Sequence, residues 1–155
     1  MTDITIRRGR SADLPEVIVM ADSADSAAHW TTEDYAHIFQ SPRTLLIAEQ
    51  NGTIVGFIVA FDVAGDWELE NVAVAPGHRR RGIARKLMDS LIEAAGESGA
   101  KAIFLEVRES NIAAKSLYER CGFQRYGRRR DYYANPSEDG LLYRFLCSSA
   151  TREKC

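Results

Sequence analysis

The chain has 155 residues, a length typical of one globular domain. Apolar residues make up 45% of it and charged residues 27%, so the composition excludes an intrinsically disordered chain, a collagen-like chain and a small disulfide scaffold. The 20 Lys and Arg residues against 22 Asp and Glu leave a net charge of −2, which gives no indication of nucleic-acid binding.

Charged residues are unevenly distributed along the chain. No Lys or Arg occurs from Thr44 to His78, a stretch that holds five Asp or Glu residues, and basic residues then crowd 79–86. An acidic segment beside a basic one suggests a site that handles a cation and an anion side by side. Two solvated faces are the alternative interpretation.

Neither a metal site nor a membrane segment is predicted. The three cysteines are odd in number, widely spaced and without a CxxC pair, and the three histidines are isolated. This pattern indicates reduced thiols in a cytoplasmic protein that holds no metal. The first residues lack the apolar core of a signal peptide, and no apolar run approaches 18 residues, so we expect no membrane association.

From its start, the sequence predicts a strand and then two helices. Residues 4–7 alternate between apolar and polar side chains, as in a half-buried strand. A helix is expected over 14–20 with Ser11 or Asp13 as its cap, and another over 31–39 with its first threonine as the cap.

A hairpin and a further strand follow. Asn51-Gly52 separates the β-rich runs 45–49 and 54–60, and Asn-Gly between such runs is the strongest short-range hairpin signal. Residues 67–74 form the further strand.

The second half of the chain is predicted to alternate helices with strands. Apolar residues over 82–97 recur at steps of one, three and four, which indicates one face of a long helix, and Gly99 is placed to end it. A buried strand is expected over 102–107 and a helix over 111–120. Residues 123–132 and 141–146 are expected to form a closing hairpin.

Early hairpins followed by βαβ crossovers predict one α/β domain over residues 1–147. We expect a mixed central sheet of about seven strands with helices on both faces. Residues 148–155 are predicted to form a polar C-terminal tail.

The sharpest functional signal is the segment that opens the long helix. A strand runs through a Pro-Gly turn into Arg79-Arg80-Arg81-Gly82-Ile83-Ala84. Unpaired N–H groups and the positive end of the helix dipole favour an anion there, and the small Gly82 and Ala84 leave room for a phosphate. A merely solvated helix start is the alternative. The P-loop pattern and the GxGxxG dinucleotide fingerprint are both absent.

This segment resembles the acyl-CoA-binding motif of the GNAT superfamily of N-acetyltransferases. The motif stands here as Arg79-x-x-Gly82-x-Ala84, with Ala84 in place of the commoner second glycine. In that superfamily the amides of this loop hold the pyrophosphate of coenzyme A. The resemblance therefore implies a GNAT fold, acetyl-CoA as co-substrate, and cofactor binding by Arg79, Arg80, Arg81, Gly82, Ile83 and Ala84.

A second cluster narrows the resemblance. Residues 105–123 meet every fixed letter of LEVRxSNxxAxxLYxxxGF, the pattern of the RimI-type branch, which comprises ribosomal-protein alanine N-acetyltransferases. Residues 129–133 match the RRNYY of that branch except that Asp131 replaces Asn, and His29-Trp30-Thr31 resembles its Pro-Trp-Ser without the Pro. The resemblance spans about residues 4 to 146 and is weakest before residue 40, where the substrate-facing helices lie.

Acetyl transfer from a thioester to an amine needs a neutral amine, an oxyanion donor and a proton for the leaving thiolate. An α-amine is roughly a tenth neutral at pH 7, whereas a lysine is far less so. The resemblance places the general base on Glu106, the one acid within the apolar run 103–107, where we expect partial desolvation. It places the general acid on Tyr118. A structural Glu106 paired with an arginine and a core aromatic Tyr118 are the alternatives.

The remaining candidates line the cofactor and the acceptor. By resemblance, Asn111 contacts CoA, although it is also a plausible helix N-cap. The backbone amides of Val72, Ala73 and Val74 are expected to bind the thioester carbonyl and the pantetheine. Four residues are assigned to the substrate side: Glu68, Glu70, Tyr132 and Tyr133. We expect Glu68 and Glu70 on one strand face with Val72 and Val74, as an auxiliary base or a wall that attracts a cation, because some GNAT branches keep their base at about the Glu68 position. A solvated strand face and strand aromatics are the alternatives.

The function that follows is direct acetyl transfer from acetyl-CoA to the N-terminal α-amine of a protein, such as a ribosomal protein. A covalent acetyl-cysteine route is not expected, because Cys121 has no histidine near it in the sequence. A small-molecule amine acetyltransferase and a non-catalytic CoA- or ribosome-binding module are the alternatives. Direct contact with nucleic acid is not predicted.

Overall fold

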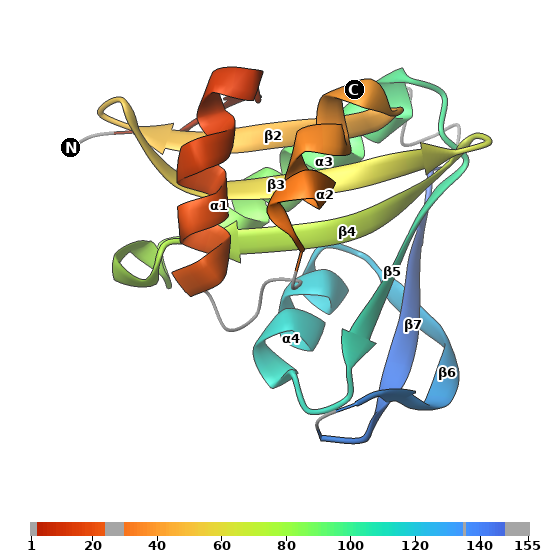
Figure 1. Ribbon diagram of the computed structural model, residues 1–155. Helices are drawn as coiled ribbons and strands as arrows, with labels where there is room; N and C mark the ends of the chain where they lie inside the picture. The colour runs from red at the N-terminus through yellow and green to blue at the C-terminus, as the bar shows by residue number, and fades with distance from the viewer. Residues whose placement is uncertain (1–2, 24–29, 135, 148–155) are drawn as a thin grey trace.

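The computed structural model describes residues 3–23, 30–134 and 136–147. The strands of this part are β1 (Thr5–Arg8), β2 (Arg43–Gln50), β3 (Thr53–Val63), β4 (Asp66–Val74), β5 (Ala102–Arg108), β6 (Gln124–Tyr133) and β7 (Glu138–Leu146). The helices are α1 (Leu14–Ser23), α2 (Thr32–Ala36), α3 (Ile83–Glu97) and α4 (Ile112–Arg120), with short 3-10 helices at Ser11–Asp13, His37–Gln40 and Pro76–His78. The strands form one seven-stranded sheet in the order β1-β2-β3-β4-β5-β7-β6 (Figure 1).

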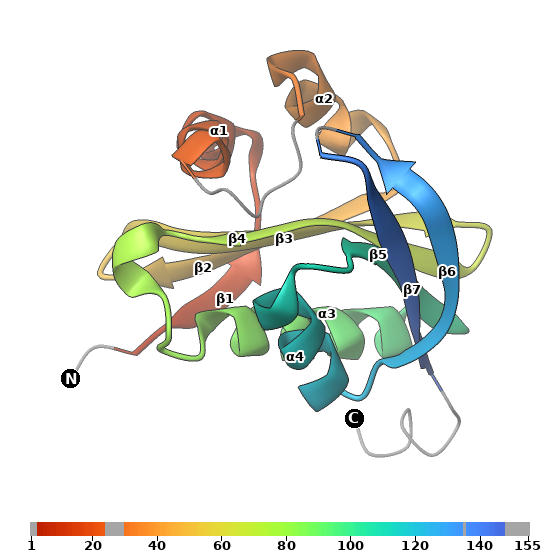
Figure 2. The ribbon, with the colours of Figure 1, turned by 90° about the horizontal axis from the view of Figure 1, so that it is seen from below.

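Helices lie on both faces of this sheet, with α1 and α2 on one side and α3 and α4 on the other (Figure 2). Each face has its own core. Val17, Tyr35 and Phe57 belong to the core beneath α1 and α2, whereas Leu87 and Ile103 belong to the core beneath α3 and α4. The predicted mixed sheet of about seven strands with helices on both faces is therefore confirmed. The expected tail at 148–155 lies outside the described residues.

The predicted helix over 31–39 is two shorter helices, α2 and the 3-10 helix His37–Gln40. Thr31 caps α2 as expected, because its Oγ1 accepts a hydrogen bond from the Asp34 amide at 3.1 Å. The Asp34 carboxylate accepts one in return from the Thr31 amide at 2.8 Å, which completes a capping box. The Ser41 hydroxyl then donates to the carbonyl oxygen of His37 at 2.9 Å, which satisfies an end group of the second helix.

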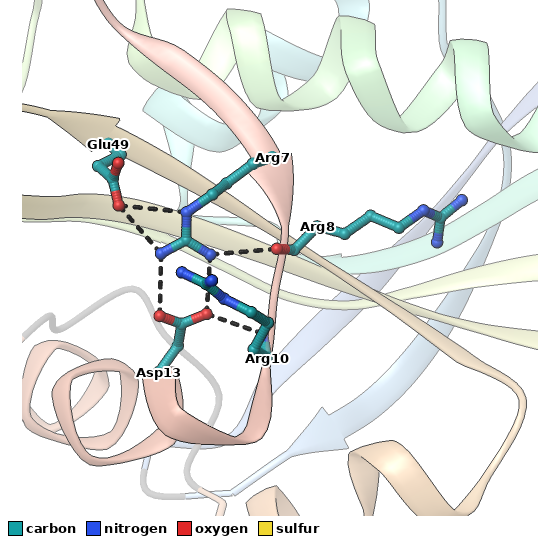
Figure 3. A network of polar contacts seen from close by, with 5 residues as sticks. All are labelled: Arg7, Arg8, Arg10, Asp13 and Glu49. Carbon is teal, nitrogen blue, oxygen red and sulfur yellow. Dashed lines mark hydrogen bonds and ion pairs between the residues drawn. The ribbon is translucent and has the colours of Figure 1, made fainter. Parts of the chain in front are cut away.

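The expected caps of α1, Ser11 and Asp13, form a 3-10 helix directly before it. Asp13 connects this helix to β1 (Figure 3). Its carboxylate accepts two hydrogen bonds from the Arg7 guanidinium, at 2.8 and 2.9 Å, and one from the Arg10 amide at 2.7 Å. Arg7 also donates to Glu49 on β2, at 3.0 and 3.1 Å. Only 9% of the Asp13 side chain is exposed, so these bonds form away from most of the solvent.

We expect Asp13→Asn to destabilise the fold by about 2 kcal/mol at pH 7, which corresponds to a melting temperature roughly 4–8 °C lower. The bonds from Arg7 lower the pKa of Asp13 to about 2 from 3.8. A carboxyl whose pKa is lower in the folded state stabilises that state above its unfolded pKa and loses this contribution as the pH falls. The difference between wild type and variant in urea unfolding should therefore be constant above pH 5 and shrink below pH 4. A difference that persists unchanged at pH 3 would contradict this account, and the more exposed Glu49→Gln provides the control.

Strand β4 pairs irregularly with both of its neighbours, β3 and β5. In the pairing with β3, Val59 faces Asn71 and Ala60 faces Leu69, so Glu70 is an extra residue that forms a β-bulge. On the other side, β4 and β5 pair in parallel over three residues, Asp66–Glu68 with Ala102–Phe104, and then diverge (Figure 1). Both irregularities lie where the sequence predicts the site.

Candidate active site

The divergence of β4 and β5 exposes the edge of β4 at the predicted thioester site. The amide of Ala75 donates to Val55 on β3 at 2.8 Å. Because successive N–H groups of a strand point to opposite edges, the amides of Val72 and Val74 are directed to the edge that β5 has left. The amide of Ala73 is directed to β3. Of the three amides assigned to the cofactor, two are thus oriented toward an incoming carbonyl.

The loop before α3 has the features of an anion site. Gly82 is the N-cap of α3 with a left-handed backbone (φ +78°), no side chain caps the helix, and its first turn holds no acidic residue. Arg80 also has a positive φ of 64°, and alternating backbone of this kind turns successive N–H groups inward. Apart from Gly82 and its two chain neighbours, no atom of the described residues lies within 4 Å of the place a Gly82 Cβ would take. The exposed Arg79, Arg80 and Arg81 add positive charge.

Asn111 serves as the N-cap of α4. Its side-chain oxygen accepts a hydrogen bond from the Ala114 amide at 3.1 Å. This is the structural alternative considered for this residue, and it fixes the start of the helix that carries Tyr118. Contact between Asn111 and CoA remains a prediction.

Tyr118 lies in the core beneath α3 and α4, where it packs against Phe123 and Tyr143 with ring centroids 6.0 and 6.4 Å away. The residue is 7% exposed. Burial raises the pKa of its hydroxyl well above the usual value, and the hydroxyl of Tyr133 contributes to this effect. Tyr118 is therefore protonated throughout the neutral range, and its hydroxyl has a proton available to donate.

Glu106 lies on the opposite face of β5 from Tyr118. Ile103, Leu105 and Val107 enter the core beneath α3 and α4, and alternation along the strand turns Glu106 to the side of α1 and α2. Its carboxylate pairs with Arg129 on β6, with 3.3 Å between Oε1 and Nε, and the side chain is 27% exposed.

Tyr132 joins this cluster. The negative charge of Glu106 and a hydrogen bond to it raise the pKa of Tyr132, and Glu68 on β4 adds a smaller effect. The rings of Tyr132 and Tyr133 meet edge to face at 5.0 Å between centroids. Glu68, Glu106 and Tyr132 are thus brought together from three strands.

The backbone that brings Tyr132 to Glu106 is a wide bulge in β6. Arg129 faces Gly140 on β7 and Tyr133 faces Glu138, so the three residues 130–132 of β6 lie opposite a single residue of β7. Within this bulge Asp131 has a left-handed backbone with φ +51°. Asp and Asn adopt this conformation more readily than other non-glycine residues, which explains why Asp131 can replace the Asn of the motif.

Gly140 on β7 has no side chain, and the rings of Tyr132 and Tyr133 pack against its backbone. A Cβ at Gly140 would lie 3.3 Å from the ring of Tyr132 and 3.3 Å from that of Tyr133. The sequence alone indicates no role for this glycine. Its actual place, within a strand opposite the bulge, depends on the register of β6 and β7.

Glu70 is held by Arg43, with the two carboxylate oxygens 2.7 Å from Nε and 3.2 Å from Nη2. Both residues line a pocket of about 220 Å³ with Trp30, Asp34 and His37. The bulge at Glu70 turns it toward α2, whereas Val72 and Val74 pack toward α3. The expectation that Glu68 and Glu70 share a face with these valines is therefore wrong, because an extra residue in the strand inverts the alternation beyond it.

No group of three His, Cys, Asp or Glu side chains in the described ranges is arranged to hold a metal ion. None of the helices in those ranges is long and apolar enough to cross a membrane.

Comparison with known proteins gives consistent matches. Residues 14–123 match the model of the Acetyltransferase (GNAT) family. A [ribosomal protein bS18]-alanine N-acetyltransferase from Escherichia coli strain K12 is 36% identical over 137 residues, which cover 88% of this chain and 90% of the relative. The crystal structure of the ribosomal-protein-S18-alanine N-acetyltransferase from Escherichia coli superposes with a TM-score of 0.87 at 30% identity, covering 94% of this chain and 95% of that one.

A Salmonella typhimurium acetyltransferase solved with its cofactor acetyl-CoA has the same fold, with a TM-score of 0.81 at 20% identity over 95% of both chains. These matches agree with the resemblance drawn from residues 79–84 and 105–123.

Proposed function

Since the chain belongs to the Acetyltransferase (GNAT) family, we propose that it transfers the acetyl group of acetyl-CoA to the α-amine of a protein N-terminus. The relative from Escherichia coli that carries the name of a bS18-alanine N-acetyltransferase supports an N-terminal alanine, and a ribosomal protein, as the acceptor. The observation that carries the proposal is the placement of Glu106 and Tyr118 on opposite faces of β5, beside the point where β4 and β5 diverge.

In the proposed reaction the thioester carbonyl of acetyl-CoA accepts hydrogen bonds from the amides of Val72 and Val74, which polarise it. The acceptor amine gives a proton to Glu106, directly or through a water molecule, and its nitrogen attacks the carbonyl carbon. A C–N bond forms and the C–S bond breaks. Tyr118 donates a proton to the departing thiolate and regains one from solvent, and Glu106 releases to solvent the proton that it took. The CoA thiol thus gains one proton for the one that the amine loses on becoming an amide.

The α-amine is the natural acceptor for this arrangement. With a pKa near 8, roughly a tenth of it is already neutral at pH 7, so one carboxylate is enough to remove the remaining proton. Tyr132 and Tyr133 stand beside Glu106 and can hydrogen-bond the backbone that follows the amine.

The proposal is tested by mass spectrometry of protein N-termini from cells with and without this chain. We expect acetylation of a small set of N-termini to depend on the chain, and the purified enzyme to acetylate peptides of those sequences. An unchanged set together with CoA release on small amines would establish the small-molecule alternative. Absence of CoA release on both a peptide library and small amines would favour the non-catalytic binding module.

We expect Tyr118→Phe to preserve the fold and lower kcat at least tenfold. The phenylalanine keeps the buried ring and its packing but removes the proton that the thiolate needs. Donors with a thiol of lower pKa should partly restore the rate, because their thiolates need less assistance. Steady-state kinetics, under conditions where chemistry limits the rate, provides the measurement.

Tyr143→Phe is the matched control for this variant. Its hydroxyl lies in the same core and donates to the Glu119 carboxylate at 2.8 Å, so its loss should alter stability and leave kcat unchanged. A Tyr118→Phe enzyme with kcat within about twofold of wild type would make Tyr118 a core aromatic without a role in the reaction.

A further inference from the structure

Glu106 has a counterion from its own chain. The Arg129 Nε lies 3.3 Å from Oε1 of Glu106, and the arginine side chain is 55% exposed. The same guanidinium lies over the ring of Tyr132, with 5.3 Å between its carbon and the ring centroid. The carboxylate assigned as the base is thus already occupied by a cation.

Other arginines near this hairpin are held more firmly. Arg128 contacts two carboxylates, Oε2 of Glu109 at 2.5 Å and Oδ2 of Asp139 at 2.7 Å. Arg108 pairs with Glu138 at 3.1 Å and also donates to two backbone carbonyl oxygens. Arg129 has one ion pair in the described part of the chain, and it is longer than any of these.

An acceptor amine competes with Arg129 for the Glu106 carboxylate. A base must come within hydrogen-bond reach of the amine, and about nine-tenths of an α-amine arrives as a cation at pH 7. A guanidinium and an ammonium group repel each other if both contact one carboxylate. Of the described residues, Tyr132 and Tyr133 on β6 and, beyond Tyr132, Glu68 on β4 also face Glu106. A further cation on this side is Arg108 on β5, whose guanidinium lies over the Tyr133 ring and pairs with Glu138.

We propose that Arg129 is a displaceable counterion, which neutralises Glu106 in the free enzyme and is replaced by the ammonium group of the acceptor. This inference rests on the proposed function of Glu106. The guanidinium can leave the carboxylate and remain over the Tyr132 ring, because cation–π attraction holds it there. Arg129 therefore determines specificity. A cationic amine competes with it for Glu106, whereas a neutral group of the same shape forms no ion pair with Glu106 and gains nothing by displacing Arg129.

The first test is the affinity and turnover of Arg129→Gln. The probe is a hexapeptide with an N-terminal alanine and a free α-amine, and calorimetry on the CoA-bound enzyme gives its dissociation constant. We expect the peptide to bind about two- to fivefold more tightly to the variant, the worth of an exposed ion pair. The kcat should stay within twofold of wild type, because Arg129 has already left Glu106 in the complete complex. Weaker or unchanged binding, or a fivefold loss of kcat, overturns the proposal and makes Arg129 a residue that orients Glu106 or holds the acceptor.

Two controls separate displacement from a general charge effect. Arg130→Gln removes the same charge from the next residue of β6 and should change the affinity less than half as much. A peptide with a hydroxyl group in place of the α-amine should bind wild type and Arg129→Gln equally. The proposal is wrong if Arg130→Gln raises the affinity as much as Arg129→Gln does, or if the hydroxyl peptide also binds Arg129→Gln more tightly. The change in affinity would then come from the overall electrostatic field of the protein.

A measurement that does not depend on turnover completes the test. The Nε–H resonance of Arg129, assigned by its loss in Arg129→Gln, is followed by NMR as alaninamide is added to the CoA-bound enzyme. We expect it to move toward its position in Glu106→Gln, and to stay in place when sodium chloride is added instead. A resonance that alaninamide leaves unchanged overturns the displacement. If no peptide is acetylated while this resonance moves, the proposed function fails and the displacement stands.

Discussion

Replacing Glu106 with glutamine should lower kcat/KM by roughly 10²–10⁴ at neutral pH and leave acetyl-CoA binding nearly intact. The amide has the shape of the carboxylate but cannot accept a proton from the acceptor amine. Glu106 lies on the face of α1 and α2, away from the loop assigned to the cofactor, so CoA affinity has no reason to change. Steady-state kinetics with an α-amine peptide, together with calorimetry for CoA, measures both quantities.

Glu68→Gln is the matched comparison. Glu68 stands on the neighbouring strand, directly beside Phe104 in the parallel ladder, and its charge raises the pKa of Tyr132 less than that of Glu106 does. We expect its loss to affect kcat/KM much less. A larger loss from Glu68→Gln than from Glu106→Gln would transfer the role of base to β4.

Gly82→Glu should weaken CoA binding roughly 100-fold. The substitution places a carboxylate at the N-terminus of α3, where the proposed pyrophosphate lies, and like charges repel there. It also forces a side chain onto a backbone with φ +78°, which costs on the order of 1–3 kcal/mol. Isothermal titration with CoA gives the affinity.

Gly99→Glu separates the two effects. Gly99 follows the other end of α3, has φ +82° and likewise has open space beside it, so the variant carries the same strain and the same charge far from the loop. It should lower stability and leave CoA affinity unchanged. An unchanged affinity in Gly82→Glu would show that the loop before α3 is not the anion site.

Much of the fold could be predicted because its signals are local. Asn51-Gly52 determines the hairpin of β2 and β3, and both residues have a positive φ, as a two-residue turn of this kind requires. The apolar stripe of α3 and its end at Gly99 were likewise predicted, and the Ala100 amide bonds to the Ala95 carbonyl as in a Schellman motif. The family and its acetyltransferase activity are confirmed by the match over residues 14–123.

The bulge at Glu70 could not be predicted in the same way. A bulge depends on which residues of two strands face each other, and periodicity within one strand carries no information on that pairing. The assumption of unbroken alternation put Glu70 on the face of Val72, whereas the structure directs it to Arg43.

The candidate site was predicted in its parts but not in its assembly. Glu106 and Tyr132 come from strands that do not pair with each other, so their proximity results from the bulge in β6 and the missing side chain of Gly140. Arg129 belongs to the motif at residues 129–133, but the sequence assigned it no role in the site. An arginine partner was the structural alternative for Glu106, but the two residues are far apart in the sequence, and no local pattern identifies Arg129 as that partner.

The divergence of β4 and β5 also bears on the order of events in catalysis. With the base on one face of the sheet and the acid on the other, the proposed reaction has two entrances: donor and acceptor approach from opposite sides and meet at the exposed edge of β4. In the proposed reaction neither has to leave before the other can enter, so we expect both to occupy the enzyme together and no acyl-enzyme to carry the group between them. On this proposal we expect the acetylated chain to withdraw from the acceptor side while CoA is still bound.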